Sequence, residues 1–201
     1  MSRRVYGALL HQVAKRGGLH VLRVFCRELG SAARRATPRA LELRPLAAAE
    51  LLSHCRDPEL DLREAMIEET LRRGDLCLGA LEGSALLGYV WFAYEIAPHV
   101  DGIWVRVPPR AVYRFKSFVR PSFRGMGIAA ALYNAADAVI GRPGRAAVVD
   151  CVTVQNAASI AATLKSGSRP LGALAYWQAG RCFVAFHSPS VRGLGLRFYR
   201  P

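Results

Sequence analysis

Apolar positions follow two different periods along the chain, which predicts a mixture of strands and helices. Short apolar or alternating runs between turn residues predict strands over 41–43, 76–81, 85–94, 112–119, 146–152, 171–177 and 182–187. Apolar residues spaced three and four apart predict helices over 46–54, 61–73, 127–140 and 157–165. Strands precede, interrupt and follow the helices. This order predicts an α/β fold with a mixed, mostly antiparallel central sheet and flanking helices.

Residues 95–110 contain three prolines and are expected to form a long loop with a short strand over 103–107. Loops held on a rigid scaffold often carry binding groups.

The first 39 residues predict a helical arm and a linker, set apart from a second unit over 40–201. Apolar residues recur at helical spacing over 3–14 and 19–29, and a pair of glycines separates the two expected helices. Arginine and lysine occupy the other faces, so the arm is expected to be basic and amphipathic. The linker is expected over 31–39.

Charge is distributed unevenly along the chain. The formal net charge is +13, of which residues 1–40 contribute +8 and residues 76–201 contribute +9, whereas residues 42–75 carry −4. A basic amphipathic helix is typical of a segment that docks on an anionic surface. Residues 1–39 are therefore expected to bind an anionic membrane surface or an acidic acyl carrier protein, unless their apolar face packs on the rest of the chain.

Composition narrows the classes of function. The basic residues are scattered and accompany no helix-turn-helix, zinc-finger or RNA-binding motif, which argues against nucleic acid. Five cysteines form no C-x-x-C pair and five histidines form no H-x-x-x-H pair, so no metal site is expected. Free thiols and the lack of a secretion signal or a long apolar run predict a cytoplasmic protein, peripheral to the membrane if the arm docks there.

The clearest chemical signal lies where an expected strand leads into an alanine-rich helix. The strand ends at Val119, Pro121 turns the chain, and the glycine-containing segment 124–129 opens the helix. Main-chain N–H groups at a helix start bind phosphate, and glycines allow close approach. The segment therefore predicts a pyrophosphate site, beside which Arg124 adds positive charge.

Other interpretations of this segment stay open. Residues 125–130 match the dinucleotide pattern G-x-G-x-x-G/A, and Asp150 follows at a spacing suited to a ribose. Against a dinucleotide site, residues 121–124 separate the strand from the first glycine, and no second βαβ half is visible. A glycine-containing turn without a ligand is the remaining alternative.

The same residues resemble the acyl-CoA site of the GNAT N-acetyltransferase superfamily. Its signature Q/R-x-x-G-x-G/A is met by Arg124, Gly127 and Ala129. Downstream, residues 156–159 and 165–167 resemble the family's N-x-x-A/S and K-x-G elements. The resemblance covers about residues 40–187. It implies a GNAT-like fold with acetyl-CoA or another acyl-CoA as acyl donor.

The resemblance also implies a role for each matched residue. Main-chain groups of Phe118 and Val119 would contact the pantetheine arm of coenzyme A between two diverging strands. Asn156 would lie beside the pantetheine, and Ser159 near its thiol end. Main-chain N–H groups would bind the pyrophosphate over Arg124, Gly125, Met126, Gly127, Ile128 and Ala129.

The chain departs from the family at the group that protonates the leaving thiolate. Many members carry a tyrosine seven residues after the asparagine, and this position is Thr163 here. A threonine hydroxyl is a much weaker acid than a phenol, so Tyr176 is an alternative candidate. Glu95 is the favoured general base because it ends a strand beside the expected loop, and Asp150 is the second choice.

The expected reaction is transfer of an acyl group, most simply acetyl, from coenzyme A to a primary amine by direct attack on the thioester. Alternatives of other kinds stay open. They are transfer of longer acyl groups from coenzyme A or a carrier protein at a membrane surface, binding of acyl-CoA without catalysis, and nucleic-acid binding.

Overall fold

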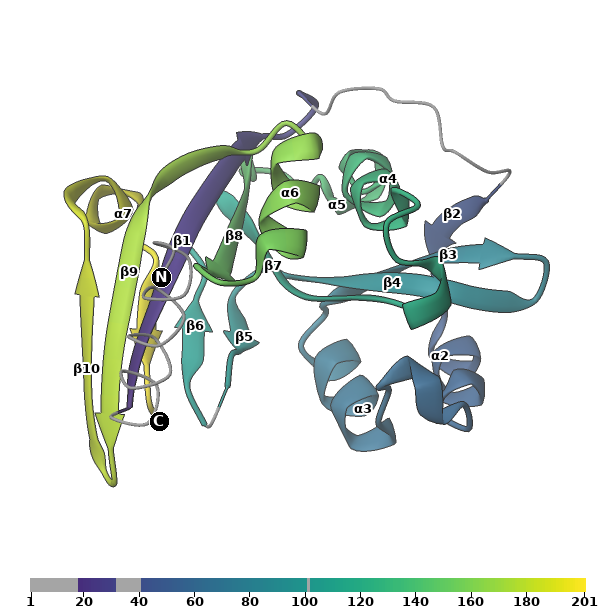
Figure 1. The fold of residues 1–201 in the computed structure, drawn as a ribbon, viewed down its shortest axis with the longest axis horizontal. Helices are drawn as coiled ribbons and strands as arrows, with labels where there is room; N and C mark the ends of the chain where they lie inside the picture. The colour runs from purple at the N-terminus through teal and green to yellow at the C-terminus, as the bar shows by residue number, and fades with distance from the viewer. Residues whose placement is uncertain (1–17, 32–40, 101) are drawn as a thin grey trace, which may run out of the picture.

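The computed structural model describes residues 18–31, 41–100 and 102–201 and contains two sheets (Figure 1). The strands are β1 (Leu19–Glu28), β2 (Glu42–Pro45), β3 (Leu76–Glu82), β4 (Ala85–Ala93), β5 (Ile96–Pro98), β6 (Trp104–Arg106), β7 (Ala111–Val119), β8 (Ala147–Thr153), β9 (Arg169–Ala179), β10 (Cys182–His187) and β11 (Arg197–Tyr199). The helices are α2 (Ala48–His54), α3 (Glu64–Arg72), α4 (Ile128–Ala135), α5 (Asp137–Ile140), α6 (Ala157–Lys165) and α7 (Pro189–Leu194), with 3₁₀ turns η1 (Pro58–Leu60) and η2 (Pro121–Phe123).

The main sheet has the strand order β10-β9-β1-β8-β7-β4-β3-β2, and a smaller sheet has the order β11-β6-β5. Every pair of neighbouring strands is antiparallel except β7 and β8, which are parallel. This arrangement confirms the expected α/β fold with a mixed, mostly antiparallel sheet. The small sheet was not expected in full, because β5 and β6 form a hairpin within the segment assigned to a loop.

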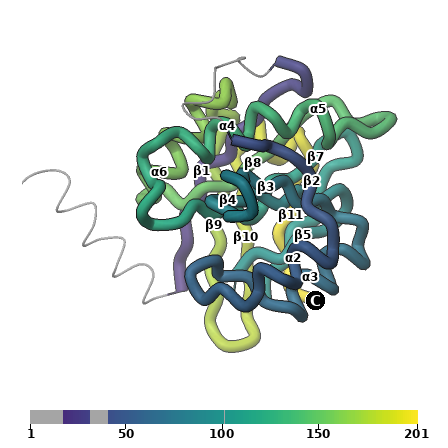
Figure 2. Tube along the Cα trace, turned by 90° about the vertical axis from the view of Figure 1, so that its right-hand side faces the viewer, coloured from purple at the N-terminus to yellow at the C-terminus, as the bar shows by residue number. Residues whose placement is uncertain are grey.

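Helices cover the β2–β4 half of the main sheet on both faces. Figures 1 and 2 show α4 and α5 on one side of these strands and α2 and α3 on the other. Leu132 of α4 packs with Val90 of β4 in one core, and Ile67 of α3 packs with Trp91 in another. Because successive strand residues point to opposite faces, this half of the sheet is buried on both sides.

The expected helix over 19–29 is wrong, since residues 19–28 form β1. This strand pairs with β8 on one side and β9 on the other, and both of its faces are covered over its second half. Leu22 and Phe25, on opposite faces, are both buried, so apolar residues three apart imitate a helical period. The expected helix over 3–14 lies outside the described residues, as does most of the linker. The boundary between residues 39 and 40 stays a prediction.

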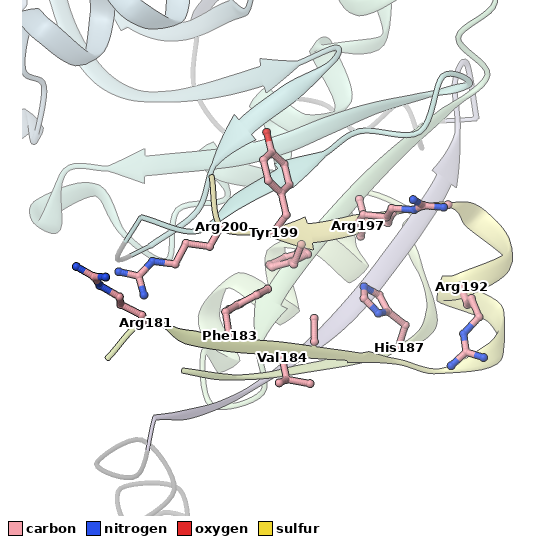
Figure 3. Close-up of a pocket in the computed structure, with 12 residues that line it drawn as sticks. Arg181, Phe183, Val184, His187, Arg192, Arg197, Tyr199 and Arg200 are labelled. Atoms are coloured by element: carbon pink, nitrogen blue, oxygen red, sulfur yellow. The ribbon is translucent and has the colours of Figure 1, made fainter. Parts of the chain in front are cut away.

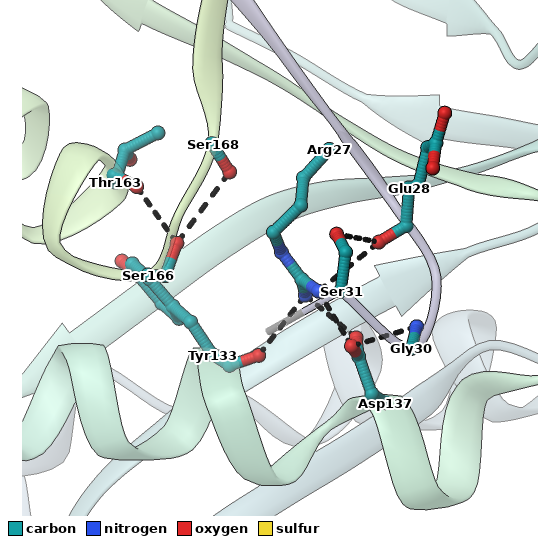
Figure 4. Close-up of polar contacts among 9 residues, drawn as sticks. All are labelled: Arg27, Glu28, Gly30, Ser31, Tyr133, Asp137, Thr163, Ser166 and Ser168. Atoms are coloured by element: carbon teal, nitrogen blue, oxygen red, sulfur yellow. Dashed lines mark hydrogen bonds and ion pairs between the residues drawn. The ribbon is translucent and has the colours of Figure 1, made fainter. Parts of the chain in front are cut away.

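An ion pair holds β1 to the helical layer above the sheet (Figure 4). Arg27 donates to Asp137 Oδ1 at 2.6 Å and to the Tyr133 carbonyl at 3.4 Å, and its side chain is 2% exposed. The Gly30 N–H donates to the same carboxylate at 3.0 Å. Arg27 and Gly30 therefore attach the end of β1 to Tyr133 of α4 and to Asp137 of α5.

The parallel strands β7 and β8 separate partway along their length. Their pairing begins at Ala111 with Ala147 and ends at Arg114 with Asp150, although β7 continues to Val119 and β8 to Thr153. A bulge at Phe115 shifts the pairing of β7 with β4 at this point. Bulges bend a strand and increase its twist, so the bulge turns β7 away from β8. We call the diverging segments 115–119 and 151–153 the fork.

Within the described ranges, no helix combines the length and the apolar character that crossing a bilayer requires.

Candidate functional site

The cofactor loop, residues 120–127, connects the end of β7 to the start of α4. Gly125 and Gly127 have φ of 82° and 81°, in the left-handed region that glycine adopts most easily. Gly127 is the N-cap of α4, so the first N–H groups of this eight-residue helix have no partner within the helix. The glycine spacing in the sequence therefore corresponds to a turn that exposes main-chain donors.

Close packing of β7 on β4 holds this loop in position. Gly88 of β4 pairs with Val119, and a Cβ at Gly88 would lie 2.8 Å from the Phe118 carbonyl oxygen and 3.4 Å from a methyl group of Ile128. A larger residue would push the end of β7 away from α4. The missing side chain at Gly88 thus allows the strand end and the helix start to approach each other.

A cavity of about 500 Å³ lies between the cofactor loop, α4 and α6, and we call it the first cavity. Nine of the ten residues expected to bind the cofactor line it. They are Phe118, Val119, Arg124, Gly125, Gly127, Ile128, Ala129, Asn156 and Ser159. Met126 does not line it and is 44% exposed, which leaves only its main chain available to a phosphate.

Positive charge lies on both sides of the first cavity. Arg124 Nε donates to the Val119 carbonyl at 3.1 Å, and the guanidinium lies 5.9 Å from the Phe118 ring centre. Lys165, at the last turn of α6, lines the opposite side. A cation on each side and free N–H groups at a helix start suit a pyrophosphate.

Asn156 serves as the N-cap of α6. Its Oδ1 accepts a hydrogen bond from the Ser159 N–H at 3.0 Å, which satisfies one free donor of the first helical turn. The asparagine and serine predicted from the second motif are therefore neighbours in one cap. This cap lies where the first cavity meets the fork.

A second cavity, of about 290 Å³, occupies the fork itself. It shares Ser117, Phe118, Tyr133, Asn156 and Ser159 with the first cavity, so the two cavities adjoin. Its remaining lining includes five ionisable side chains, those of Asp61, Arg114, Lys116, Asp150 and Cys151. A long ligand in the first cavity would therefore end among polar and charged side chains.

Arg114 is the centre of a buried polar network at the base of the fork, where the pairing of β7 with β8 ends. Its Nε forms an ion pair with Asp150, and the two side chains are 4% and 2% exposed. Its Nη2 donates to Thr163 Oγ1 at 3.1 Å, and its guanidinium lies 3.4 Å from the Tyr133 ring centre. Burial raises the pKa of the Asp150 carboxyl even though Arg114 opposes the shift.

Tyr133 is a candidate functional residue that the sequence did not reveal. It lies on α4, is 4% exposed, and lines both cavities. Its hydroxyl donates to Ser117 Oγ at 2.8 Å, and Ser117 is an exposed residue of β7. In the sequence, this residue is marked only as a tyrosine in the alanine-rich helix that directly follows the glycine loop.

The three expected catalytic residues lie in different parts of the fold. Thr163 is 1% exposed and lines the second cavity. Glu95 is exposed beyond the end of β4 and lines neither cavity. Tyr176 also lines neither, because it is 1% exposed in the core, where its ring stacks on His20 at 4.6 Å between ring centres. Of the three, only Thr163 lines one of the two cavities.

No group of three or more histidine, cysteine, aspartate or glutamate side chains suited to a metal ion occurs among the residues that the structure describes.

A mixed sheet that forks beside a glycine-capped helix start places the chain among the α/β folds of the acetyltransferase class. A family model described as Acetyltransferase (GNAT) family matches residues 41–167, so the chain belongs to the GNAT acetyltransferase family. This confirms the resemblance drawn from the two motifs. A comparison with curated proteins gave no match.

Solved structures show the same fold at low sequence identity. A GCN5-related N-acetyltransferase from Sphaerobacter thermophilus has a TM-score of 0.54 and 14% identity, covering 97% of this chain and 57% of that one. One from Kribbella flavida has a TM-score of 0.53 and 12% identity, covering 94% and 66%. The aminoglycoside N-acetyltransferase AAC(6')-Iy in complex with CoA has a TM-score of 0.51 and 21% identity, covering 70% and 100%.

The chain spans between 55% and 66% of the length of six of the matched proteins.

Proposed function

We propose that the protein transfers an acyl group, most simply acetyl, from coenzyme A to a primary amine. The observation that carries this proposal is the junction of the two cavities. The first cavity, which the cofactor loop lines, adjoins a second cavity lined by polar and ionisable side chains. An acyl donor whose phosphates lie at the cofactor loop would then extend its thioester toward the second cavity.

The fork suits the extended part of such a donor. Residues 115–119 of β7 pair with β4 on one side only, so alternate N–H and C=O groups face the fork without a strand partner. An extended pantetheine chain could pair with them as an added strand would. An N–H group of residues 115–118, which line the second cavity, would also donate to the thioester carbonyl and stabilise the negative charge that develops on its oxygen.

Acetyl-CoA supplies a carbonyl that an amine can attack and a thiolate that must leave. We assign Tyr133, rather than Thr163, to the protonation of that thiolate. The Tyr133 hydroxyl lies where the cavities meet, whereas Thr163 Oγ1 accepts a hydrogen bond from Arg114. A phenol is also a far stronger acid than an aliphatic hydroxyl. Thr163 then acts as a positioning residue that holds the guanidinium.

The acceptor amine must lose a proton before or during attack. Asp150 lines the second cavity, and burial raises the pKa of its carboxyl, whereas Glu95 is exposed outside both cavities. We therefore propose Asp150 as the general base in place of Glu95. Its ion pair with Arg114 fixes the carboxylate at the base of the fork.

The family description and the CoA complex of a protein with the same fold support coenzyme A as the carrier of the acyl group. Longer acyl groups, delivered by coenzyme A or by an acyl carrier protein, are the second candidate, since the basic residues 1–39 would favour an acidic carrier or an anionic membrane surface. The five cysteines are free, which supports a reducing compartment such as the cytoplasm.

A thiol-release assay tests the proposal. The full chain is mixed with acetyl-CoA, or with an acyl-CoA of longer chain, and with each member of a panel of primary amines. We expect release of free coenzyme A that depends on the amine and falls sharply with Gly127→Glu. Binding of acyl-CoA without amine-dependent release would show an acyl-CoA-binding protein instead. Equal binding of NAD would favour the dinucleotide interpretation.

A further inference from the structure

A third cavity, of about 750 Å³, shares no lining residue with the other two (Figure 3). It is formed by β10, α7, β11 and the turn before β10. Four arginines lie along it: Arg181, Arg192, Arg197 and Arg200. We call this cavity the basic groove. The acyl transfer proposed above gives it no role.

The four arginines are gathered at the two ends of the basic groove. Arg181 and Arg200 lie at one end, and Arg192 and Arg197 at the other (Figure 3). Arg200 donates to the Gly180 carbonyl at 2.6 Å, which connects the chain after β11 to the turn before β10. The six residues of β10 separate the two ends, a length of roughly 17–20 Å.

Among the described residues, no acidic side chain forms an ion pair with these arginines. Residues 151–201 contain no aspartate or glutamate. The pKa of His187, which also lines the groove, is lowered by burial and by Arg192 and Arg197. The groove therefore has a positive potential suited to an anionic ligand.

The middle of the basic groove is apolar. Phe183 and Ala185 line it from β10, and Phe198 from β11. A ligand that fits the whole groove thus needs negative charge at both ends and a less polar part between them.

Both strands that flank the basic groove are edge strands. Among the strands that the structure describes, β10 pairs only with β9, and β11 pairs only with β6. Each strand therefore has one row of main-chain N–H and C=O groups without a strand partner. An extended peptide can bind such an edge through its main chain while its side chains select the site.

We propose that the basic groove binds an extended acidic peptide segment of a partner protein, with carboxylates at both ends and small or apolar side chains between them. A single small anion would reach only one pair of arginines. A nucleic acid would place a phosphate over the apolar middle as well as at the ends. An extended peptide satisfies the charges, the apolar centre and the strand edges together.

Fluorescence anisotropy with the full chain tests this proposal. The first peptide is the labelled decapeptide Asp-Asp-Thr-Val-Thr-Val-Thr-Val-Asp-Asp. A second has the same composition with its four aspartates in the centre, and a third has asparagine in place of aspartate. We expect the first to bind at least about tenfold more tightly than the others, since four carboxylate–arginine contacts add small increments. Equal binding of all three, or no binding, would overturn the proposal.

Paired variants locate the binding. Arg181→Glu with Arg192→Glu reverses one charge at each end of the basic groove. Arg23→Glu with Arg169→Glu makes the same change of charge at exposed positions outside it. We expect the groove variant to weaken binding of the first peptide at least about tenfold and the control variant to weaken it much less.

Circular dichroism and the melting temperature show whether each variant is folded. If the charge reversal prevents folding, Arg181→Gln with Arg192→Gln tests the same contacts. Equal weakening by the groove and control variants would overturn the proposal, because net charge alone would then explain binding. The proposal would also be overturned if single-stranded DNA or phosphatidylglycerol vesicles bound as tightly as the first peptide, or more tightly, and the groove variant abolished that binding. The site would then recognise a polyanion or a membrane.

Discussion

The guanidinium of Arg114 lies 3.4 Å from the centre of the Tyr133 ring while the same group forms an ion pair with Asp150. One arginine thus connects β7, β8 and α4 at the point where the sheet forks. Because a cation over an aromatic face and a buried ion pair both restrict the side chains involved, Tyr133 has little freedom to leave the junction of the cavities. Its hydroxyl is held at Ser117.

The first prediction concerns the acid. Tyr133→Phe removes the hydroxyl but keeps the ring over Arg114, so the fold should be retained. We expect kcat with acetyl-CoA and an accepted amine to fall by about 10²-fold, at the lower end of general acid catalysis, with a small change in KM. Steady-state kinetics of thiol release measure this.

Thr163→Val is the matched comparison, because it also removes one hydroxyl from the lining of the second cavity. We expect a change of less than about threefold in kcat, together with a loss of stability of about 1.5–3 kcal/mol from the broken hydrogen bond to the charged Arg114. The opposite result, a large loss in Thr163→Val and none in Tyr133→Phe, would transfer the acid role back to Thr163.

The second prediction concerns the buried ion pair. Asp150→Asn leaves the Arg114 charge buried without its partner, which should lower the unfolding free energy by about 3–5 kcal/mol. Asp61→Asn breaks an ion pair with Lys116 at 3.0 Å, but the Asp61 side chain is 62% exposed, so the loss should be less than about 1 kcal/mol. Urea unfolding of both variants measures the two losses of unfolding free energy. Similar losses would mean that the fork does not depend on the buried pair.

The third prediction concerns the cofactor loop. At a concentration 100 times its Kd, acetyl-CoA should raise the melting temperature by about 5–10 °C, and NAD should not. Gly127→Glu should abolish this shift, since it places a carboxylate among the phosphate donors. Gly144→Glu is the control, because Gly144 has φ of 80° against 81° at Gly127 and lies outside the first cavity. A shift lost in both variants would point to general destabilisation.

The cofactor loop could be predicted from the sequence because its chemistry is local. The glycines at 125 and 127, the preceding arginine and the helix that follows are adjacent in the chain, and their φ values match the expected turn. The polar network of the fork could not be predicted in the same way. Arg114, Asp150 and Tyr133 belong to three different elements, and only the sheet register and the packing of α4 bring them together.

The position of β1 shows a second limit of sequence patterns. Apolar spacing identifies a strand when one face is polar, but β1 has buried residues on both faces. Arg27 added to the error, because a charged residue is expected at a surface, whereas here its side chain is 2% exposed and paired with Asp137. The strand conformation of β1 and the burial of Arg27 both depend on residues that are distant in the sequence.

The fourth prediction concerns pH. Burial raises the pKa of Asp75 to about 6, outweighing the ion pair with Arg73 at 2.9 Å. A raised folded-state pKa adds stability below the unfolded pKa of 3.8, and this contribution is lost as pH rises through about 6. Relative to Asp75→Asn, the unfolding free energy of the wild type should therefore fall between pH 4 and 7, by up to about 3 kcal/mol. If the unfolding free energy of the wild type instead rose with pH relative to Asp75→Asn, the ion pair with Arg73 would outweigh burial.

The fifth prediction concerns the basic N-terminal segment, and β1 determines where it can be cut. Deleting residues 1–36 would remove a strand that pairs with both β8 and β9, so we expect that protein to be insoluble or unfolded. Deleting residues 1–17 leaves β1 intact while removing four basic residues and no acidic one. This shorter deletion separates docking from folding.

If the segment docks on an anionic surface, deleting residues 1–17 should abolish co-sedimentation with phosphatidylglycerol vesicles, or activity with an acyl carrier protein, and leave activity with acyl-CoA unchanged. Each basic residue near such a bilayer contributes on the order of 1 kcal/mol, so four together suffice for reversible binding. The wild type should bind vesicles at low salt and dissociate at high salt, because the attraction is screened. If the segment instead packs on the rest of the chain, the deletion should lower the melting temperature, and the wild type should not co-sediment at either salt concentration.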